Sequence, residues 1–307
     1  MIPFPDISPE LFAFDFFGFE LALRWYALAY IIGILIAWWL GKVVLSRPQM
    51  WRDNQPVMRS EQFENLITYL ILGVIVGGRL GYVLFYSPEH FFGDPLAILK
   101  IWQGGMSFHG GLLGVAIVAF IFALHQRLSL LSTGDLLALM TPPGLLLGRI
   151  ANFINAELWG RPSDLPWGVV FPGQAAQDCG QQIGTLCARH PSQLYEAAFE
   201  GFLLGTVLLW IAFRKSGLKK PGILMGSFLV GYGLARFVVE FVRQPDAQFI
   251  TDGNPIGFAW RLGEFGLTQG QALSLPMIAL GVGLIWRANA GEGGDEEQMI
   301  ETRAREN

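Results

Sequence analysis

The chain has 307 residues, of which 52% are hydrophobic and 15% are charged. Because a soluble globular domain carries about 25% charged residues, this composition excludes an ordinary soluble protein and indicates a helical protein that crosses a membrane several times. The formal net charge of −4 excludes little, because the side of the membrane on which each charge lies is more informative than the sum.

The first twenty residues contain three prolines and several phenylalanines but no lysine or arginine. A secretory signal peptide begins with a positively charged region, so this stretch does not resemble a cleavable leader. We expect it to form an arm that lies at the membrane interface rather than a span.

Seven apolar stretches follow, and each approaches the ~20 mostly apolar residues that a membrane-spanning helix requires. They cover residues 21–41, 66–86, 109–124, 133–151, 195–213, 222–241 and 269–286. The third is short and rich in glycine at its start, which fits a tilted or re-entrant entry. The sequence therefore predicts an all-α integral membrane protein with one seven-helix domain over 1–287 and a disordered tail over 288–307.

Lysine and arginine concentrate in the loops after the first, third and fifth stretches and in the tail. These residues are Lys42, Arg47, Arg52, Arg59, Arg127, Arg214, Lys215, Lys219, Lys220, Arg287, Arg303 and Arg305. Because cytoplasmic loops carry the excess of these residues, the pattern predicts an N-terminus outside and a C-terminus in the cytoplasm.

One predicted outer loop is long, from about 152 to 191, and its many Pro, Gly and Gln residues indicate a small extramembrane head. It contains both cysteines, Cys179 and Cys187. On an oxidising side of the membrane a disulfide between them is expected, with two free thiols as the alternative. Their spacing matches no zinc-binding pattern, so no metal is expected.

The most unusual polar stretch, residues 148–162, directly follows the apolar run 136–147. It contains two arginines, two asparagines and a glutamate: Arg149, Arg161, Asn152, Asn155 and Glu157. An arginine at the bilayer centre costs about 2.5–3.5 kcal/mol on insertion scales, so such groups are usually kept where a partner meets them. Snorkelling towards the interface explains a lone arginine, but it does not explain Asn and Glu beside it.

A second polar group ends the sixth stretch, where Arg236, Glu240 and Arg243 follow i, i+4, i+7 spacing and share one helix face. An intrahelical Arg–Glu pair is the simpler interpretation, and it is compatible with a site in the bundle interior. A further intramembrane arginine, Arg79, lies among glycines and is interpreted as structural or lipid-contacting.

His109 lies where the third span begins. The positive end of the helix dipole disfavours imidazolium there, so a neutral ring could accept a proton; a structural histidine among glycines is the alternative. Arg149 and Arg236 end different spans on the same predicted side, and guanidinium groups bind phosphate bidentately. The residues thus indicate an intramembrane enzyme or transporter for an anionic amphiphile such as a phospholipid.

The stretch Gly148-Arg149-x-Ala151-Asn152-Phe153-x-Asn155-x-Glu157-x-x-Gly160 resembles the signature of the bacterial phosphatidylglycerol–prolipoprotein diacylglyceryl transferases. Four other blocks resemble the same family in the same order. They are Trp25-Tyr26, Ser107 to Gly111, His190 to Glu196, and Arg236 to Gln248. The two cysteines are not part of the pattern.

The resemblance implies a seven-span inner-membrane transferase whose active site lies towards the periplasmic side. It implies transfer of the diacylglyceryl group of phosphatidylglycerol to the lipobox cysteine of a preprolipoprotein, with a thioether formed and glycerol phosphate released. The expected partners are these two substrates and membrane lipids, with no nucleic acid, metal or cofactor.

On this hypothesis Arg149 and Arg236 stabilise the phosphate, and Asn152 and Tyr26 hydrogen-bond the headgroup. Glu157 and Glu240 orient the arginines or act as base, and Gly160 belongs to the lipid-binding stretch. His109 is the competing base, with His190 as a weaker candidate.

Two alternatives remain at this point: a lipid flippase or permease, and another lipid-headgroup transferase with the same phosphate clamp. The helix break expected at Pro142-Pro143 is typical of transporters, but no inverted repeat is visible in the sequence.

Overall fold

The computed structural model describes residues 1–16, 19–86, 88–180, 185–245, 247–251, 253–263 and 265–306. Residues 181–184 of the predicted head, Asp246 and Asn307 lie outside the described residues. The chain divides into two compact units, which are considered separately below. Unit 1 comprises Met1–Leu40 and Asp135–Asn307, and unit 2 comprises Gly41–Gly134.

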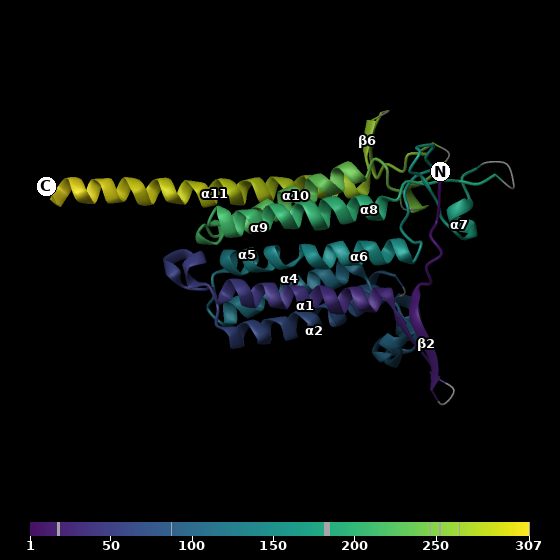
Figure 1. The fold of residues 1–307 in the computed structure, drawn as a ribbon, viewed down its shortest axis with the longest axis horizontal. Coiled ribbons are helices and arrows are strands. Elements are labelled where there is room, and N and C mark those ends of the chain that lie inside the picture. Colours follow the sequence, from purple (N-terminus) through teal and green to yellow (C-terminus); the bar gives the residue numbers. More distant parts are fainter. Residues whose placement is uncertain are drawn as a thin grey trace. The chain divides into compact units, whose positions relative to one another are not determined.

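Six helical segments in the described residues are long and apolar enough to cross a membrane, so the protein is a mostly helical, multi-pass membrane protein (Figure 1). Four of them are α1 (Trp25–Leu45), α2 (Ser60–Phe85), α4 (Phe108–His125) and the first part of α11 (Gln269–Glu306), over Gln269–Ala290. The other two are Leu130–Ile154, made of α5 (Leu130–Met140) and α6 (Pro142–Ile154), and Ser192–Arg214, made of α8 (Ser192–Glu196), a π-helix (Ala197–Leu203) and α9 (Leu204–Arg214).

A seventh apolar helix, α10 (Ile223–Val239), is shorter than the other six. All seven predicted stretches are therefore helical, but a count of seven spans stays a prediction. The first stretch begins later than predicted, because residues 21–24 belong to a strand rather than to α1.

The N-terminal segment forms short strands rather than a span. β2 (Glu10–Phe16) pairs antiparallel with β3 (Phe19–Arg24), and Arg24 lies 3.4 Å from Glu10 across this hairpin. Before it, β1 (Ile2–Pro3) pairs in parallel with β4 (Val169–Val170) of the head. The ring of Phe4 packs on Phe153 and Phe171, with centroids 5.4 and 5.5 Å apart. The arm is thus attached to the head by backbone pairing and aromatic packing.

Unit 2 is held together by close packing of α2 on α4. Glycines line the contact, and a Cβ atom built at Gly81 would be 2.7 Å from the Cα of Gly110. Small residues at such a contact let the helix backbones approach, which is the main source of helix association in lipid. The remaining elements of unit 2 are short: η1 (Pro48–Met50), η2 (Arg52–Asn54), α3 (Pro88–Gly93), η3 (Pro95–Leu99) and η4 (Ile101–Gln103).

Arg79 of α2 has a structural role in unit 2, which decides between the two interpretations of the sequence. Its side chain is buried and donates hydrogen bonds to five backbone carbonyl groups. These belong to Ala97, Ile98, Lys100, Gly104 and Gly105. The guanidinium group thus pairs with carbonyl groups of a segment that lacks a regular hydrogen-bond ladder, which is required where backbone lies near lipid.

In unit 1, α9, α10 and α11 run side by side (Figure 1), and α10 packs on both neighbours. A Cβ built at Gly226 of α10 would be 2.8 Å from the carbonyl oxygen of Gly281 on α11, so both glycines permit the approach. The buried carboxylate of Asp135 accepts hydrogen bonds from the backbone N–H groups of Gly222 and Met225. Asp135 therefore caps the start of α10 from a different helix.

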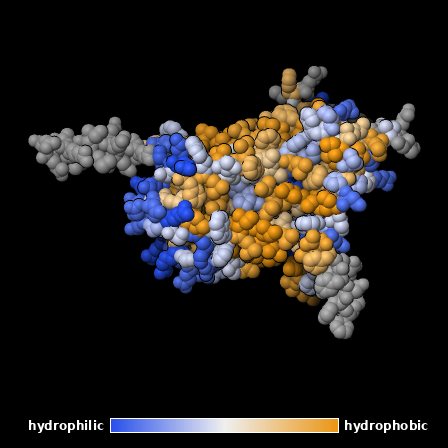
Figure 2. All heavy atoms as spheres, in the orientation of Figure 1, coloured by the Kyte–Doolittle hydropathy of each residue, from blue (hydrophilic) through white to orange (hydrophobic). Residues whose placement is uncertain are grey.

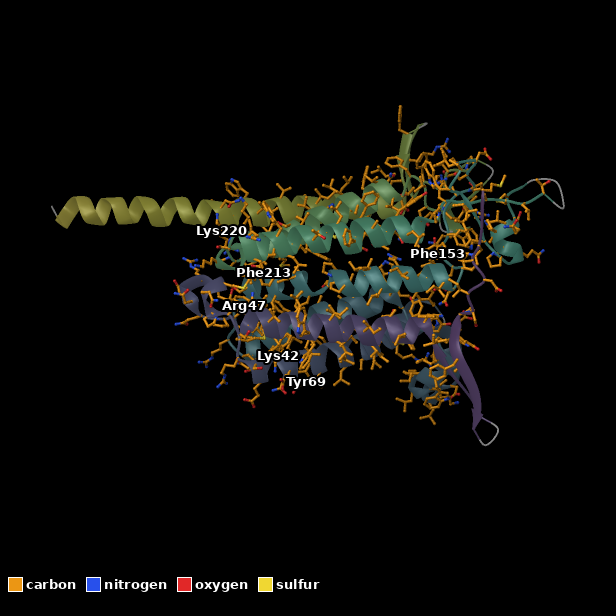
Figure 3. All side chains as sticks on the ribbon, viewed as in Figure 1. Lys42, Arg47, Tyr69, Phe153, Phe213 and Lys220 are labelled. Carbon is orange, nitrogen blue, oxygen red and sulfur yellow. A yellow bond between two sulfur atoms is a disulfide. The ribbon has the colours of Figure 1, made fainter. Side chains whose placement is uncertain are left out.

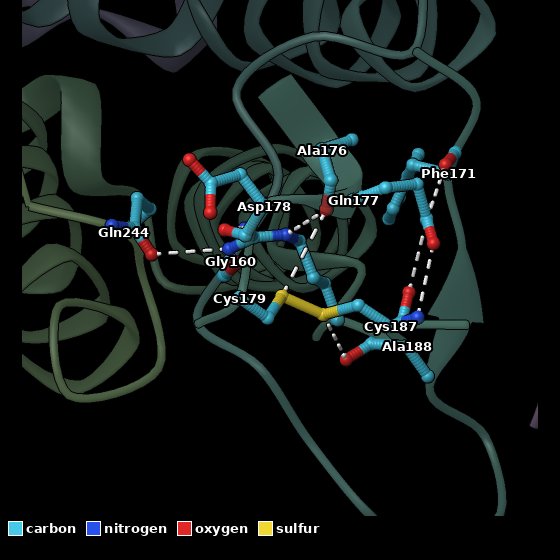
Figure 4. Close-up of a disulfide and its surroundings, with 10 residues drawn as sticks. Gly160, Phe171, Ala176, Gln177, Asp178, Cys179, Cys187, Ala188 and Gln244 are labelled. Atoms are coloured by element: carbon cyan, nitrogen blue, oxygen red, sulfur yellow. Dashed lines mark hydrogen bonds between the residues drawn. A yellow bond between two sulfur atoms is a disulfide. The ribbon is translucent and has the colours of Figure 1, made fainter. Parts of the chain in front are cut away.

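The head contains the predicted disulfide, Cys179–Cys187, with the two Cα atoms 6.3 Å apart (Figure 4). Gln177, at the end of α7 (Gln174–Gln177), bonds the carbonyl groups of Phe171 and Cys187 and the N–H of Cys187. Arg189 is buried beside it and donates to the carbonyl groups of Ala176 and Asp178. These bonds fix both ends of the disulfide-closed segment.

Exposed side chains on the helices have the distribution expected for a lipid-facing surface. Large apolar residues such as Leu35, Trp39, Leu84 and Trp210 are exposed, and Figure 2 shows hydrophobic side chains over the middle of the helices. Because lipid is as apolar as these side chains, their exposure carries no penalty in a bilayer.

Charged and polar residues lie at the helix ends. In unit 1, Phe213 and Lys220 lie at the opposite end of the helices from Phe153 (Figure 3). The lysine-rich turn containing η6 (Gly217–Lys219) is therefore separated from the head by the length of the helices.

α11 continues as a helix through Glu306, beyond the apolar span that ends at Ala290. The composition of residues 288–307 predicts a disordered tail, whereas the described part of this tail is helical. Its last residues include several Glu and two Arg, which are good helix formers. The expected cytoplasmic side of the tail stays a prediction.

Candidate active site

Arg149 lies near the end of α6 and contacts two glutamates of the neighbouring span. Its Nε atom is 3.1 Å from Oε2 of Glu196, and its Nη2 atom is 3.5 Å from Oε2 of Glu200. Tyr232 of α10 also lies close enough to interact with it electrostatically. Three elements of unit 1 therefore meet at this arginine.

Glu196 also contacts the arginines at the end of α10. Nη1 of Arg236 is 2.8 Å from Oε1 of Glu196, and Nη2 of Arg236 is 2.9 Å from Oε2 of Glu240. The Nε atom of Arg243 is 3.8 Å from Oε1 of Glu196. The structure thus brings Arg149 and Arg236 to one carboxylate, and the Arg236–Glu240 pair expected from the sequence is present.

We call the six side chains Arg149, Arg236, Arg243, Glu196, Glu200 and Glu240 the arginine–glutamate cluster. The side chains of Glu196 and Glu200 are completely buried, whereas those of Arg149 and Arg236 are 17% and 15% exposed. Burying a charge is costly unless it is paired, and here three cations compensate three carboxylates. The carboxylates lie underneath, and edges of the guanidinium groups remain accessible to an anion.

The spacing of the two glutamates explains why both reach Arg149. Glu196 and Glu200 are four residues apart, and the segment from Ala197 to Leu203 is a π-helix. Residues four apart lie on the same face of a helix, so both carboxylates point to the side on which Arg149 lies. π turns occur frequently at functional sites.

A second polar group surrounds Asn152, one helical turn after Arg149. Its amide nitrogen is 2.8 Å from Oε1 of Glu157 and 3.4 Å from the hydroxyl of Tyr26, which belongs to α1. Asn152 is buried, and Tyr26 is half-buried. Three of the predicted headgroup-binding residues therefore form one hydrogen-bonded set in unit 1.

Gly160 occupies a tight position in the head. A Cβ atom there would be 2.5 Å from the carbonyl oxygen of Val242, so no other residue fits without backbone movement. Its own carbonyl accepts a hydrogen bond from Arg189, which also donates to Gln244. These contacts join the head to the segment after α10. The predicted role of Gly160 in lipid binding stays a prediction.

Two head residues have pKa values that burial displaces. Burial lowers the pKa of Arg189, and the nearby charge of Asp178 opposes that change. Burial also lowers the pKa of His190, whose Nδ1 atom is 3.4 Å from the hydroxyl of Tyr195. A histidine that resists protonation in this way remains able to accept a proton.

His109 belongs to unit 2, where it is the second residue of α4 and is exposed. Ser107 caps this helix start by accepting a hydrogen bond from the N–H of Gly110. The helix start expected at His109 is therefore present. Because the cluster belongs to unit 1, the structure does not connect it with His109.

Glu196 and Glu200 were the members of the cluster to which sequence reasoning assigned no role. Glu196 ends the block that begins at His190, and Glu200 follows it four residues later within the same apolar span. Two acidic residues at i, i+4 spacing inside a span are unfavourable in lipid, and this signal was available in the sequence.

Comparison with known proteins assigns most of the chain to a protein family. The sequence matches the family described as prolipoprotein diacylglyceryl transferase over residues 12–287. A phosphatidylglycerol–prolipoprotein diacylglyceryl transferase of Roseobacter denitrificans is 62% identical over 287 residues, covering 94% of this chain and 97% of the relative. The proteins of that name from Ruegeria pomeroyi and Brucella anthropi are 62% and 45% identical, with coverage of 94% of this chain for both and of 98% and 94% of the relatives. The chain therefore belongs to the prolipoprotein diacylglyceryl transferase family.

Proposed function

We propose that this protein is a phosphatidylglycerol–prolipoprotein diacylglyceryl transferase and catalyses the first step of bacterial lipoprotein maturation. The family assignment and relatives of that name at 62% identity support the reaction. The main structural support for the proposed active site is that Arg149 and Arg236 both contact the buried carboxylate of Glu196.

The chemistry requires a place for growing negative charge. The acceptor thiolate attacks the glycerol carbon that bears the phosphate ester, a C–S bond forms, and the C–O bond breaks. The electron pair stays on the phosphate oxygen, and glycerol phosphate leaves. Arg149 and Arg236 stabilise this charge, because donors held at a developing anion contribute a few kcal/mol each. Glu196 and Glu240 hold these two guanidinium groups in position.

The acceptor thiol has a pKa near ~8.5, so a base or a positive field must favour the thiolate at neutral pH. His109 is the first candidate for this base, and Glu157 and Glu240 are the competing ones. Asn152 and Tyr26, which share a hydrogen-bonded set with Glu157, bind the lipid headgroup in this proposal, together with Gly160.

We further propose seven spans in a bacterial inner membrane, with the N-terminus and the head in the periplasm. The distribution of lysine and arginine supports this orientation, and a disulfide in the head suits an oxidising compartment. Both substrates, the lipid and a preprolipoprotein with a lipobox cysteine, then reach the site from the membrane.

The test uses purified full-length protein, phosphatidylglycerol labelled in its acyl chains, and a lipobox peptide. We expect a lipid-linked peptide and released glycerol phosphate. Arg149→Ala and Arg236→Ala should each abolish transfer while leaving a folded, membrane-inserted protein. Near-wild-type transfer by either variant would remove that arginine from the phosphate site, and lipid movement without product would favour a transporter.

The base is tested by comparing His109→Gln with the wild-type protein across pH. If His109 accepts the thiol proton, the variant loses the dependence of the rate on pH that a general base at this position produces. An unchanged pH–rate profile would eliminate His109 and leave the carboxylates as candidates.

A further inference from the structure

A cavity of about 330 Å³ lies beside the arginine–glutamate cluster in unit 1. It is bounded by the end of α10, the loop after it, the hairpin of β5 (Trp260–Leu262) and β6 (Phe265–Leu267), and the start of α11. Glu240 belongs both to the cluster and to the wall of this cavity. A ligand whose charged part binds Arg236 can therefore extend into the cavity past Glu240.

The cavity wall contains hydrogen-bond donors that the protein does not use. Arg161 donates through Nη2 to the carbonyl of Ile256, at 2.9 Å, but its buried Nε has no partner among the described residues. Thr268 and Gln271 form a capping box at the start of α11: each backbone N–H donates to the other residue's side-chain oxygen. This arrangement uses the two side-chain oxygens and leaves the hydroxyl proton of Thr268 and the amide N–H groups of Gln271 available.

The acceptor in the wall is the carboxylate of Glu240. Its Oε2 atom pairs with Arg236, and the carboxylate lies against Gly270, where a Cβ would be 2.5 Å from Oε2. One anionic acceptor among several unused donors fits a ligand with neighbouring hydroxyl groups, since each hydroxyl both donates and accepts. An ammonium group would instead meet Arg161 and the other donors, and an acyl chain would leave all of them unpaired.

We propose that this cavity is the subsite for the free glycerol of the phosphatidylglycerol headgroup. Its hydroxyl groups donate to Glu240 and accept from Arg161, Thr268 and Gln271, while the phosphate lies at the arginines of the cluster. Phe241 and Phe258 contribute apolar walls, against which the carbon atoms of the glycerol pack. This inference rests on the proposed function, since it identifies how the same site selects its lipid donor.

The test compares phosphatidylglycerol with phosphatidylpropanol, which has the same phosphate charge but no headgroup hydroxyls. Purified full-length enzyme and a lipobox peptide are used with each lipid. A site built to bond a hydroxyl discriminates strongly against an analogue that lacks it, so we expect wild-type kcat/KM to favour phosphatidylglycerol by at least about tenfold.

Two variants in the cavity wall test whether the cavity causes this preference for phosphatidylglycerol. Gln271→Glu keeps the oxygen that accepts from Thr268 and removes the amide donors, and Arg161→Gln removes the free Nε donor. Each should raise KM for phosphatidylglycerol and bring the ratio between the two lipids to within about threefold, with the rate on phosphatidylpropanol little changed. The matched control is Gln269→Glu, the same chemical change at an exposed position of the same helix turn that does not line the cavity. It should retain the wild-type ratio.

The outcomes separate this inference from the function itself. Absence of transfer from any lipid by the wild-type protein would contradict the proposed function. Equal use of the two lipids by an active wild-type enzyme would overturn the glycerol subsite alone. An unchanged ratio of kcat/KM between the two lipids in folded Gln271→Glu protein would also overturn it. A change confined to the KM of the lipobox peptide would overturn it too, because it would place the peptide in the cavity. If Arg161→Gln does not fold, the isosteric Gln271→Glu variant decides.

Discussion

At the scale of single residues, the feature that determines the site is Glu196. A completely buried carboxylate is unfavourable by itself, yet Glu196 lies within 4 Å of three guanidinium groups, one from α6 and two from the end of α10. Without it, the three cations would repel one another in a medium of low dielectric constant. Glu196 acts through these arginines and is therefore a positioning residue rather than a catalytic one.

We predict that Glu196→Gln lowers stability by about 3–5 kcal/mol, because it leaves buried arginines without their counter-charge. It should also raise KM for the lipid more than it changes kcat, since the arginines lose their arrangement before chemistry begins. Thermal unfolding in detergent and steady-state kinetics measure the two effects. The matched control is Glu200→Gln, whose carboxylate has one ion pair within the described part of the chain, with Arg149 at 3.5 Å. If both variants behave alike, Glu196 has no special role.

At the scale of helices, the start of α11 supports the end of α10. The carboxylate of Glu240 lies against Gly270, so a methyl group at this position must displace it from Arg236. We predict that Gly270→Ala reduces transfer at least about tenfold although alanine favours a helix over glycine by about 0.5–1 kcal/mol. Gly283→Ala in the same helix is the control, because a Cβ there meets nothing within 4 Å. Full activity in Gly270→Ala would show that the position of Glu240 is unimportant.

In unit 2, Arg79 of α2 has a comparable effect on the irregular segment that follows α3. We predict that Arg79→Lys makes residues 94–105 sensitive to proteolysis, because an ammonium group cannot reach five carbonyl groups. Hydrogen bonds from charged donors contribute about 1.5–3 kcal/mol each, although their losses do not add. Lys100→Ala is the control within that segment. Its exposed pair with Asp94 at 3.4 Å contributes at most about 1 kcal/mol, so it should leave the cleavage pattern unchanged.

At the scale of the whole molecule, the sequence predicted the helices well and their ends less well. Long apolar runs identify spans directly, but Leu21 belongs to a strand because the hairpin partner of residues 19–24 lies earlier in the chain. Arg149 and Arg236 could be identified as site residues from the sequence, because a charged side chain near lipid is unfavourable unless a partner or a ligand pairs with it. Glu200 was not identified, although its i, i+4 spacing from Glu196 inside an apolar span was a signal, because its partner Arg149 belongs to a different helix.

The orientation of the whole chain supports one last prediction, made for two exposed positions in unit 1. Asp164 belongs to the head, and Ser216 lies in the lysine-rich turn after α9. Replacing both native cysteines by serine and introducing Asp164→Cys or Ser216→Cys gives two proteins with one thiol each. The positive-inside rule places the lysine-rich turn in the cytoplasm. A membrane-impermeant maleimide should therefore label Asp164→Cys in sealed right-side-out vesicles and Ser216→Cys only in inverted ones. Labelling of both thiols from one face would contradict the proposed orientation, and the opposite pattern would place the arginine–glutamate cluster on the cytoplasmic side.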